Sequence, residues 1–539
     1  MELHKALAKS LTAHGVDAMF GVIGDANMFF AHSFADEPST QYIGATNEAG
    51  AVMMAFGYAS KSGRLGVATV TRGPGLSNTV TGLIEAVKGR IPLLLICGDT
   101  ERYSRGNPQD IPQRDLVVST GAGFEQLRTP QTGLTDLAIA IRRAVVERRP
   151  IVFNVVPEAM WADVSYEFVQ KSIGATSTQP DEISLDTALG IIASCRRPLV
   201  VAGRGAVAAR RALVKLAERI GAPLATSLGG KDLFRGEDFD LGIMGTLAHE
   251  AALQTILEAD CVLAFGIGLN SFTTASRSLT DGKAIVHCDI DASLIGRHTK
   301  VDAAVAGDAS VVAGTLVEWL DAAEIPPTSF RTPELLQRLR SNEATGVAGS
   351  AAGAPGTVDL LTALRAIDEM VPAQRIFATD AGRYIGTSWT QIHVEDPNDF
   401  VFAVNFGAIG LGVAAGIGAA HAAQDQPVLV VCGDGGFMLG GLAEFSTAVR
   451  HQIDLICVVC NDGAYGAELI QLQDRGLPTD LARFSWPDLA PLAEAMGGSG
   501  ITVRSHDDLA AARTAIENRD RPLLIDLKID PDHVPAVGH

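Results

Sequence analysis

Cysteine, basic residues and long hydrophobic runs are all in short supply in this sequence. The 539 residues include seven cysteines, an odd number scattered through apolar segments, so reduced thiols are expected rather than a disulfide framework. Cys457 and Cys460 form a CxxC pair, but their spacing within one apolar strand places them on opposite faces. Lysine and arginine total 43 against 62 acidic residues, a net charge of −19 with no basic block, so nucleic acid is not expected as a partner.

The sequence also lacks a segment that would lead it into a membrane. Its first residues mix charges and do not have the basic start and apolar stretch of a secretory signal. The longest weakly polar segment, residues 407–423, is built from glycine and alanine and is too short for a convincing span. We interpret it as a buried helix, and we expect a cytoplasmic protein with no membrane partner.

Apolar runs of strand length alternate with amphipathic stretches of helix length along the chain. For example, a strand pattern at residues 66–70 precedes a helical stretch at 77–87 and a second strand at 91–97. This alternation predicts an α/β fold with doubly wound, mostly parallel sheets. Residues 341–356, mostly alanine, glycine and serine, have the composition of a linker. The length allows three or four domains, and we predict three, at residues 1–165, 184–340 and 357–539.

The third predicted domain contains the stretch with the clearest chemistry. An apolar strand at residues 428–432 runs into Gly433-Asp434-Gly435-Gly436, and a helical stretch follows. A glycine turn between strand and helix exposes backbone N–H groups, which suit a diphosphate, while Asp434 could hold its magnesium ion. A second apolar strand ends in Asn461-Asp462-Gly463-Ala464. Parallel strands would bring this turn and Asp434 to one carboxyl edge, which predicts a magnesium–diphosphate site.

The pairing of these two turns resembles the thiamine diphosphate signature of the superfamily that includes acetolactate synthase, pyruvate decarboxylase, benzoylformate decarboxylase and benzaldehyde lyase. Residues 44–51, 71–78, 286–291 and 407–410 resemble further motifs of that superfamily, so the resemblance covers essentially the whole chain. It implies a pyrimidine-binding N-terminal domain, a central Rossmann-like domain and a diphosphate-binding C-terminal domain. It also implies a homodimer or homotetramer with active sites at the subunit interface.

The resemblance assigns roles around the cofactor. Glu48 matches the glutamate that bonds the cofactor's pyrimidine N1′ and so helps deprotonate the thiazolium carbon, and we expect it in an apolar pocket. Ile409 resembles the aliphatic residue that holds the cofactor bent, and Gly407 the glycine whose carbonyl accepts from the 4′-amino group. The implied cofactor-binding set also includes Gly73, Asn78, Gly433, Asp434, Gly435, Gly436 and Tyr465.

The metal-binding turn departs from the superfamily pattern, which is usually Asn-Asn with the second asparagine as ligand. Here the aligned pair is Asn461-Asp462, so we expect Mg²⁺ to be held by Asp434, Asp462 and the carbonyl of Ala464.

The register of that turn leaves an alternative open. Asp434 and Asp462 are 28 positions apart, one more than the superfamily pattern, and we place the extra residue at Gly440-Gly441. If the register slips by one, Asn461 and the carbonyl of Gly463 become the ligands instead.

The residues expected near the substrate give two different signals about the reaction. Asp25 resembles the proton-handling aspartate of simple 2-oxo acid decarboxylases, and Glu468 falls where such enzymes carry a catalytic glutamate. Gln109 resembles instead the active-site glutamine of carboligases. Arg72 could receive a substrate carboxylate, although a structurally paired arginine is the commoner case.

We therefore expect a thiamine diphosphate- and Mg²⁺-dependent C–C lyase or ligase. Its small-molecule substrate would be a 2-oxo acid or a 2-hydroxy ketone, which it would decarboxylate, ligate or both. The alternative is a flavin-independent acetolactate synthase. Against a true synthase, Gln471 replaces an expected tryptophan and the flavin motif is missing from residues 265–270. An oxidase-type relative and a noncatalytic binding protein are the remaining alternatives.

Overall fold

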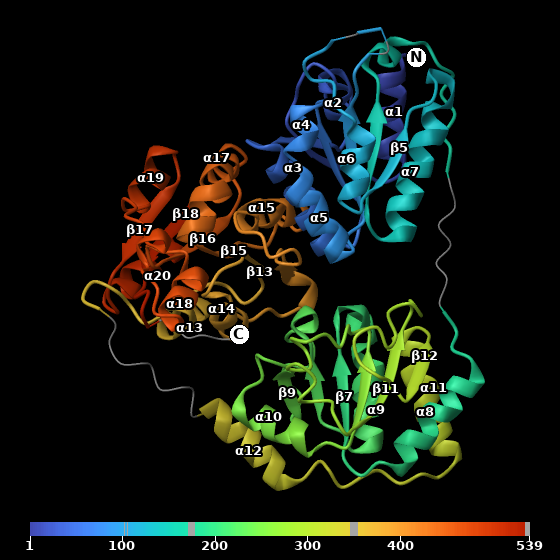
Figure 1. Cartoon of the computed structure of the whole chain (residues 1–539), viewed down its shortest axis with the longest axis vertical. Helices are drawn as coiled ribbons and strands as arrows, with labels where there is room; N and C mark the ends of the chain where they lie inside the picture. The colour runs from blue at the N-terminus through green and yellow to red at the C-terminus, as the bar shows by residue number, and fades with distance from the viewer. Residues whose placement is uncertain (102, 105, 171–177, 345–353, 534–539) are drawn as a thin grey trace. The chain divides into compact units, whose positions relative to one another are not determined.

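A computed structural model describes residues 1–101, 103–104, 106–170, 178–344 and 354–533 of the chain (Figure 1). The chain divides into two compact units. Unit 1 comprises Met1–Gly174, Ala351–Ile392 and Val401–Pro535, and unit 2 comprises Ala175–Ser350, His393–Phe400 and Ala536–His539.

The N-terminal part of unit 1 is built around a six-stranded sheet of order β2-β1-β3-β4-β6-β5, in which all paired strands run parallel. Its strands are β1 (Ala18–Gly21), β2 (Gln41–Gly44), β3 (Gly66–Val70), β4 (Leu93–Gly98), β5 (Gly123–Gln126) and β6 (Pro150–Val155). Its helices are α1 (Leu3–Ala13), α2 (Met28–Ala35), α3 (Glu48–Ser62), α4 (Pro74–Ser77), α5 (Val80–Gly89), α6 (Gln113–Ser119), η1 (Pro130–Thr132), α7 (Gly133–Glu147) and η2 (Pro157–Trp161).

The C-terminal part of unit 1 contains a second six-stranded sheet, of order β14-β13-β15-β16-β18-β17, whose pairs of described register are parallel. Its strands are β13 (Ile376–Thr379), β14 (Phe400–Phe402), β15 (Val428–Gly433), β16 (Leu455–Asn461), β17 (Ser499–Val503) and β18 (Leu523–Lys528). Its helices are α13 (Leu360–Met370), α14 (Ile385–Gln391), α15 (Gly412–Ala422), α16 (Asp434–Gly436), η6 (Phe437–Gly441), α17 (Leu442–Arg450), α18 (Gly466–Asp474), η7 (Asp480–Ala482), α19 (Ala490–Ala495) and α20 (Asp508–Glu517).

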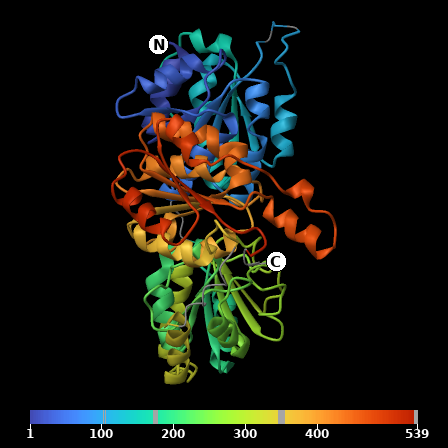
Figure 2. The same ribbon diagram turned by 90° about the vertical axis from the view of Figure 1, so that its left-hand side faces the viewer.

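Unit 2 contains the third sheet, of order β12-β11-β10-β7-β8-β9, again parallel, with helices on both faces (Figures 1 and 2). Its strands are β7 (Pro198–Ala202), β8 (Leu224–Thr226), β9 (Asp240–Ile243), β10 (Cys261–Phe265), β11 (Ala284–Asp289) and β12 (Ala303–Ala306). Its helices are α8 (Glu182–Ser194), η3 (Arg204–Ala209), α9 (Arg210–Ile220), η4 (Leu228–Gly230), α10 (Glu250–Glu258), α11 (Ala309–Ala322), α12 (Pro333–Ala344) and η5 (Pro397–Asp399).

Helices α3 and α15 join the two halves of unit 1 into one hydrophobic core. A Cβ atom on Gly57 would lie 1.8 Å from the backbone oxygen of Ala415, and one on Gly418 would lie 1.8 Å from that of Met54. Any side chain at either glycine would therefore force the helices apart. The two glycines allow a backbone-to-backbone crossing that holds both sheets in a fixed relation.

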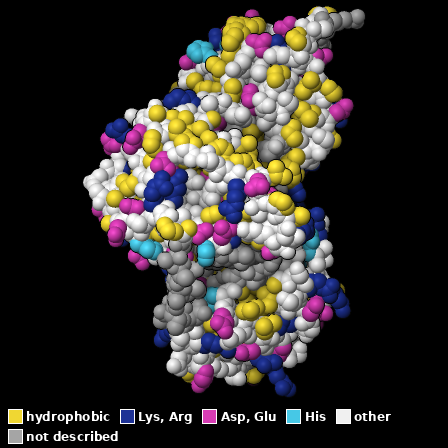
Figure 3. Space-filling view, turned by 60° about the vertical axis from the view of Figure 1, so that its left-hand side comes forward, with side chains coloured by type: hydrophobic (Ala, Val, Ile, Leu, Met, Phe, Trp, Pro, Cys, Tyr) yellow, Lys and Arg dark blue, Asp and Glu magenta, His cyan; other side chains and the backbone are white. Residues whose placement is uncertain are grey.

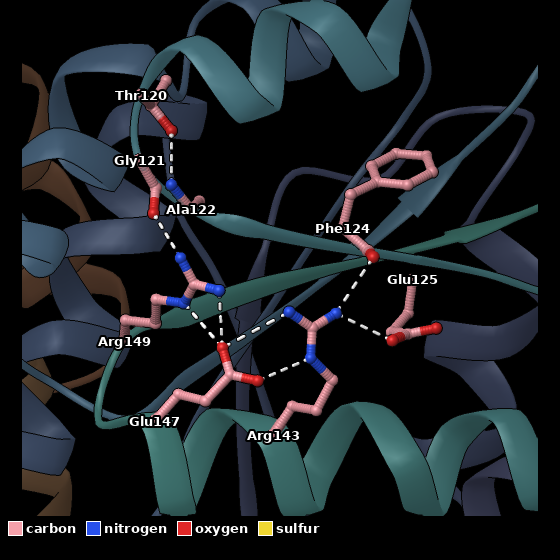
Figure 4. Close-up of polar contacts among 8 residues, drawn as sticks. All are labelled: Thr120, Gly121, Ala122, Phe124, Glu125, Arg143, Glu147 and Arg149. Atoms are coloured by element: carbon pink, nitrogen blue, oxygen red, sulfur yellow. Dashed lines mark hydrogen bonds and ion pairs between the residues drawn. The ribbon is translucent and has the colours of Figure 1, made fainter.

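A network of ion pairs fastens the outer strand β5 to helix α7 (Figure 4). Arg143 donates from Nε to Glu147 Oε1 over 2.7 Å and from Nη1 to Glu125 Oε1 over 2.7 Å. Arg149 donates from Nε to Glu147 Oε2, also over 2.7 Å, and the hydrogen bond from Arg143 is the main reason that the pKa of Glu147 is lowered. Because these side chains are partly exposed, the network orders a sheet edge and adds little stability.

The predicted α/β class with three mostly parallel sheets is confirmed, whereas the exact domain bounds stay a prediction. All seven cysteines are free. Among the described residues, no helix is both long and apolar enough to cross a membrane. Of the predicted linker, residues 341–344 belong to α12 and residues 345–353 lie outside the described residues.

Two stretches that we predicted as continuous helices are only partly helical in the structure. The stretch 77–87 is divided into α4 and α5, because Asn78 and Thr79 interrupt it. The stretch 407–423 is helical only from Gly412, and the preceding residues form a loop in which Gly407 and Gly410 adopt positive φ angles of 78° and 87°. Left-handed backbone of this kind is available to glycine and ends regular helix.

A π-helical turn, η6, lies between the two predicted metal-binding turns. It spans Phe437–Gly441 and lies between α16 and α17, so the helix that starts at Asp434 contains one widened turn. π-Turns of this kind accommodate one additional residue within an α-helix. The widened turn includes Gly440 and Gly441, where we place the extra residue, and the register stays a prediction.

Candidate functional site

The carboxyl edge of the C-terminal sheet carries a cavity of about 360 Å³. It lies where β13, β15 and β16 end and their connecting turns begin. The lining includes ten of the predicted site residues, among them Gly407, Ile409, Asp434, Gly435, Asp462 and Ala464. Gly433, Gly436, Tyr465 and the predicted catalytic Glu468 complete the predicted residues that line it.

Asp434 lies at the start of the helix that follows β15, and its side chain is only 2% exposed. Oδ1 accepts a hydrogen bond of 2.9 Å from the backbone N–H of Gly435. Oδ2 is buried and has no hydrogen-bond partner among the described residues. Burial raises the pKa of this carboxyl to about 6, against the opposing effect of nearby backbone N–H groups and of the Trp486 indole. An unpartnered buried carboxylate oxygen is costly for the protein alone and is suited to a cation.

Asp462 adds a second carboxylate to the same cavity. Burial, followed by the negative charge of Asp434, raises its pKa to about 7. Its Oδ1 accepts a hydrogen bond of 3.0 Å from the backbone N–H of Ala464, so the turn holds the carboxylate in place. Asp434 raises the pKa of Asp462, and a bound cation would stabilise two buried carboxylates placed in one cavity.

The Asn461 side chain does not line this cavity. Its Nδ2 donates a hydrogen bond of 2.8 Å to the buried Asp526 Oδ1, a residue on the neighbouring strand β18. Asp526 Oδ2 in turn accepts from the backbone N–H of Leu489 over 2.8 Å. The Asn461 side chain is thus used in packing β16 against β18, and this contact favours Asp462 over Asn461 as the side chain available to a metal.

The donor set fits a hard divalent cation. It offers two carboxylates and a backbone carbonyl, all oxygen ligands, as Mg²⁺ prefers. The part of the chain that the structure describes contains no group of three or more His, Cys, Asp or Glu side chains that could hold a metal by themselves. Oxygen ligands other than these side chains, such as a backbone carbonyl, water or an anionic group, would complete the coordination of such a cation.

The glycines of this edge leave no room for side chains. A Cβ on Gly435 would lie 2.6 Å from Tyr465 Cε1, and one on Gly436 would lie 2.7 Å from Asp380 Oδ2. Both backbone N–H groups lie in the first turn of the helix, where they have no main-chain acceptor within the helix, although that of Gly435 donates to Asp434 Oδ1. This turn can approach an anionic group closely.

Asp380 is a buried carboxylate beside the site that the sequence analysis missed. It follows β13 and is 1% exposed, and it accepts hydrogen bonds from the backbone N–H of Gly410 over 2.7 Å and of Ala381 over 2.8 Å. Burial raises its pKa to about 6. It thereby fixes the loop that carries Ile409. The signal was present, because Asp380-Ala381-Gly382 follows an apolar strand just as Asp434 does.

The carboxyl edge of the N-terminal sheet holds the predicted pyrimidine-side residues. Glu48 is the first residue of α3, and Asn78 Nδ2 donates to its Oε2 over 2.9 Å. Glu48 is half-buried in the single chain rather than enclosed in the apolar pocket that we expected. The contact with Asn78 confirms only that these two residues meet, and their roles stay predictions.

Arg72 brings two further predicted residues together. Its Nη2 donates to Asp25 Oδ2 and its Nε donates to Gln109 Oε1 over 3.1 Å. Arg72 is 8% exposed, whereas the Asp25 side chain is 60% exposed. The structurally paired arginine is therefore the correct interpretation, and it links an aspartate and a glutamine that the sequence analysis connected with different reactions.

Gln113 is a second residue that the sequence analysis passed over. It is 5% exposed, and its Oε1 accepts from the backbone N–H of Gly73 over 2.8 Å. Its Nε2 donates to the backbone oxygen of Gly98 over 3.0 Å and to Asn154 Oδ1 over 2.7 Å. A single buried glutamine at the start of the short helix α6 gives no periodic signal, so its role in fixing the Gly73 turn is visible only in the structure.

Comparison with known proteins agrees with this geometry. Three protein-family models match the chain: "Thiamine pyrophosphate enzyme, N-terminal TPP binding domain" at residues 1–120, the corresponding central domain at 185–316, and the "C-terminal TPP binding domain" at 380–527.

Full-length relatives show the same similarity. A sulfoacetaldehyde acetyltransferase of Alcaligenes xylosoxydans is 28% identical over 94% of this chain and 89% of its own length. A probable 2-ketoarginine decarboxylase of Pseudomonas aeruginosa is 29% identical over the same shares, and an acetolactate synthase of Mycobacterium bovis is 25% identical over 98% of this chain and 88% of its own. The chain therefore belongs to the superfamily of thiamine diphosphate-dependent enzymes.

Proposed function

We propose that this protein is a thiamine diphosphate- and Mg²⁺-dependent enzyme that makes or breaks a C–C bond next to a carbonyl. Its substrate would be a 2-oxo acid or a 2-hydroxy ketone. The observation that carries the metal assignment is the buried, unpartnered Oδ2 of Asp434 beside the carboxylate of Asp462. Ile409 and Glu468 line the same cavity, where they would provide an apolar support and a titratable group beside the metal.

When bound, the cofactor supplies a thiazolium carbon that becomes nucleophilic after losing its proton. Glu48 would hold a proton at the pyrimidine ring nitrogen, with Asn78 orienting its carboxylate. Asp434, Asp462 and the Ala464 carbonyl would hold Mg²⁺, which neutralises the diphosphate. The backbone N–H groups of Gly435 and Gly436 would receive the phosphate oxygens, as expected at a helix N-terminus.

The fate of the substrate would depend on the groups that can deliver a proton. Glu468 is exposed at the cavity mouth and is available as a proton donor. Asp25 accepts a hydrogen bond from Arg72, and Gln109 shares that arginine. We infer that Glu468 favours protonation after decarboxylation, while Gln109 and Asp25 orient a second carbonyl compound for ligation.

A second copy of the chain would complete the site. Neither Glu48 nor Asp25 lines the cavity that holds Asp434. Large apolar side chains near the cofactor loops are exposed in the single chain, including Ile23 at 60%, Phe406 at 42% and Leu439 at 67%. Hydrophobic side chains also gather on the face of unit 1 seen in Figure 3. Exposed apolar area of this kind suits an interface between copies.

The proposed activity is tested by mass spectrometry of reactions containing the enzyme, thiamine diphosphate and Mg²⁺. A panel of 2-oxo acids that includes pyruvate and 2-ketoarginine is incubated with and without an aldehyde acceptor, and sulfoacetaldehyde is included among the acceptors. Loss of CO₂ with an aldehyde product would support a decarboxylase, and acetolactate from pyruvate would support the synthase alternative. A complete absence of turnover and of cofactor binding would overturn the proposal.

The affinity for Mg²⁺ and thiamine diphosphate is expected to fall as the pH is lowered from 8 to 5. Asp434 and Asp462, with pKa values of about 6 and about 7, must lose their protons to bind a metal. Each proton displaced weakens metal binding by about tenfold per pH unit below the pKa. Equilibrium titration of the cofactor at constant free Mg²⁺ measures this slope, and a flat profile would contradict the carboxylate ligands.

The stability of the apoprotein should change with pH in the opposite direction to the cofactor affinity, rising as the pH is lowered. Because folding raises both pKa values above the ordinary value for aspartate, protonation favours the folded state. This contribution to stability is fully present below about pH 4. It is lost as the pH rises through 6 and 7. The increase in Tm on adding Mg²⁺ and thiamine diphosphate should therefore be larger at pH 8 than at pH 5.5.

A further inference from the structure

Two buried glutamates of unit 1 have no part in the site described above, and they make equivalent contacts. Glu444 lies in α17 of the C-terminal half and is 2% exposed, and Glu85 lies in α5 of the N-terminal half and is 0% exposed. Burial raises the pKa of each carboxyl. A buried carboxylate is costly unless it accepts several hydrogen bonds, so the partners of these two residues indicate their purpose.

Glu444 reaches from the C-terminal half to the turn that precedes α3. Its Oε1 accepts from the backbone N–H of Asn47 over 3.0 Å and from that of Thr46 over 3.2 Å. Its Oε2 accepts from Thr447 Oγ1 over 2.8 Å, which keeps the carboxylate oriented. The residue after Asn47 is Glu48, so this carboxylate fixes the backbone that immediately precedes the predicted proton-handling side chain.

The sequence makes room for this contact. A Cβ atom on Gly50 would lie 2.1 Å from Glu444 Oε1, so the carboxylate occupies the space that any other residue at position 50 would fill. A glycine in the first turn of a helix is unfavourable for helix formation. Its presence two residues after Glu48 is explained by the approach of Glu444.

Glu85 makes the reciprocal contact, from the N-terminal half to the loop that precedes α15. Its Oε1 accepts from the backbone N–H of Asn405 over 2.8 Å and from Asn405 Nδ2 over 2.7 Å. Its Oε2 accepts from the backbone N–H of Phe406 over 2.6 Å. The residue after Phe406 is Gly407, so this carboxylate fixes the backbone that leads directly into the loop carrying Gly407 and Ile409.

We propose that Glu444 and Glu85 are positioning residues for the cofactor, each of which holds, from one half of unit 1, the pyrimidine-contacting loop of the other half. Each carboxylate receives two consecutive backbone N–H groups, and the functional residue follows at once in the chain. The geometry of Glu48 on one side and of Gly407 and Ile409 on the other then depends on a charge located in the opposite half. This inference rests on the proposed roles of those three residues.

The test compares two ligands that use different parts of the site. Glu444→Gln and Glu85→Gln replace one acceptor oxygen with an amide N–H₂ that opposes the backbone N–H groups. Loss of one hydrogen bond to a charged group should weaken thiamine diphosphate binding by about tenfold or more. Binding of Mg²⁺ with inorganic pyrophosphate should change by less than about twofold, because the glycine turn at Asp434 is untouched. Calorimetric titration of the full-length protein measures both.

Asp136→Asn is the matched control. Asp136 is likewise buried, at 5% exposure, and accepts from the backbone N–H of Arg128 over 3.0 Å and from Thr132 Oγ1 over 2.7 Å. It lies on α7 and contacts neither cofactor loop, so this variant should leave both affinities unchanged. Should either glutamate variant be insoluble, Glu444→Asp or Glu85→Asp keeps the charge but withdraws it from the loop, and the same selective loss is expected.

The effects of Glu444→Gln and Glu85→Gln can be distinguished in a Glu48→Gln variant. If Glu444 acts through Glu48, adding Glu444→Gln to Glu48→Gln should weaken thiamine diphosphate binding no further. Glu85→Gln should keep its full effect in that background, because it acts through the other loop. Parallel loss of thiamine diphosphate and pyrophosphate binding, or no loss of either, would overturn the inference. Failure of the wild type to bind thiamine diphosphate would instead refute the proposed function.

Discussion

Replacing Glu48 with glutamine is expected to lower kcat by about 10²–10⁴-fold, the range over which a positioned acid or base usually contributes. The amide of glutamine cannot hold and release a proton at the cofactor's ring nitrogen, whereas it keeps the size of the side chain and can still meet Asn78. Removal of the thiazolium proton should slow to the same extent. Hydrogen–deuterium exchange at that carbon, followed by NMR, measures the step directly and needs no knowledge of the substrate.

Asn78→Ala is the informative companion to this variant. Asn78 only donates to Glu48 Oε2, so its loss should slow exchange by about tenfold while leaving the carboxylate present. Wild-type exchange and turnover in Glu48→Gln would show that another group takes the proton.

Replacing Asp434 with alanine is expected to weaken the joint binding of Mg²⁺ and thiamine diphosphate by at least about 100-fold, since a charge-assisted contact of about 3 kcal/mol is lost. The stability of the apoprotein, in contrast, should not fall when the charge of Asp434 is removed. The buried carboxylate, with a pKa raised to about 6, is an unfavourable charge above neutral pH. Asp434→Asn removes this charge, so the apoenzyme should have an unchanged or higher Tm at pH 8 while its cofactor-dependent rise in Tm disappears.

Two neighbouring substitutions distinguish the alternative ligands. Asp462→Asn keeps an oxygen ligand and removes the repulsion from Asp434, so it should reduce Mg²⁺ affinity far less than Asp462→Ala. Asn461→Ala breaks the hydrogen bond to the buried Asp526 and should lower stability by about 1–3 kcal/mol with little effect on Mg²⁺ affinity. Strong loss of Mg²⁺ affinity in Asn461→Ala together with a silent Asp462→Ala would mean that the register is shifted by one residue.

The parallel sheets could be predicted because their strands are buried on both faces and so appear as continuous apolar runs. β4 and β16 are fully buried along their lengths. The turns after β15 and β16 were recognisable because they combine glycines and carboxylates directly after such runs. Residues that act at long range left no periodic signal. Glu85 and Glu444 lie in ordinary amphipathic helices, and only the fold places them against loops some 320 and 398 positions away.

The site itself was predictable only in part for the same reason. The sequence places Asp25, Arg72 and Gln109 in separate motifs, and their shared hydrogen bonds depend on how three turns meet at one sheet edge. The exposure of Glu48 in the single chain is a different case. In the proposed oligomer its surroundings would include the second copy of the chain, which local sequence does not specify.

The close crossing of α3 and α15 has a consequence for synthesis of the chain on the ribosome. Residues 48–62 are made early, yet the helix that covers them, Gly412–Ala422, emerges some 350 residues later. At about 5–20 residues per second, the apolar face of α3 stays uncovered for tens of seconds or longer. Met53, Met54 and Phe56 are fully buried in the finished protein and would be accessible during this interval. We expect efficient production to depend on chaperones, and truncated forms ending before residue 412 to aggregate.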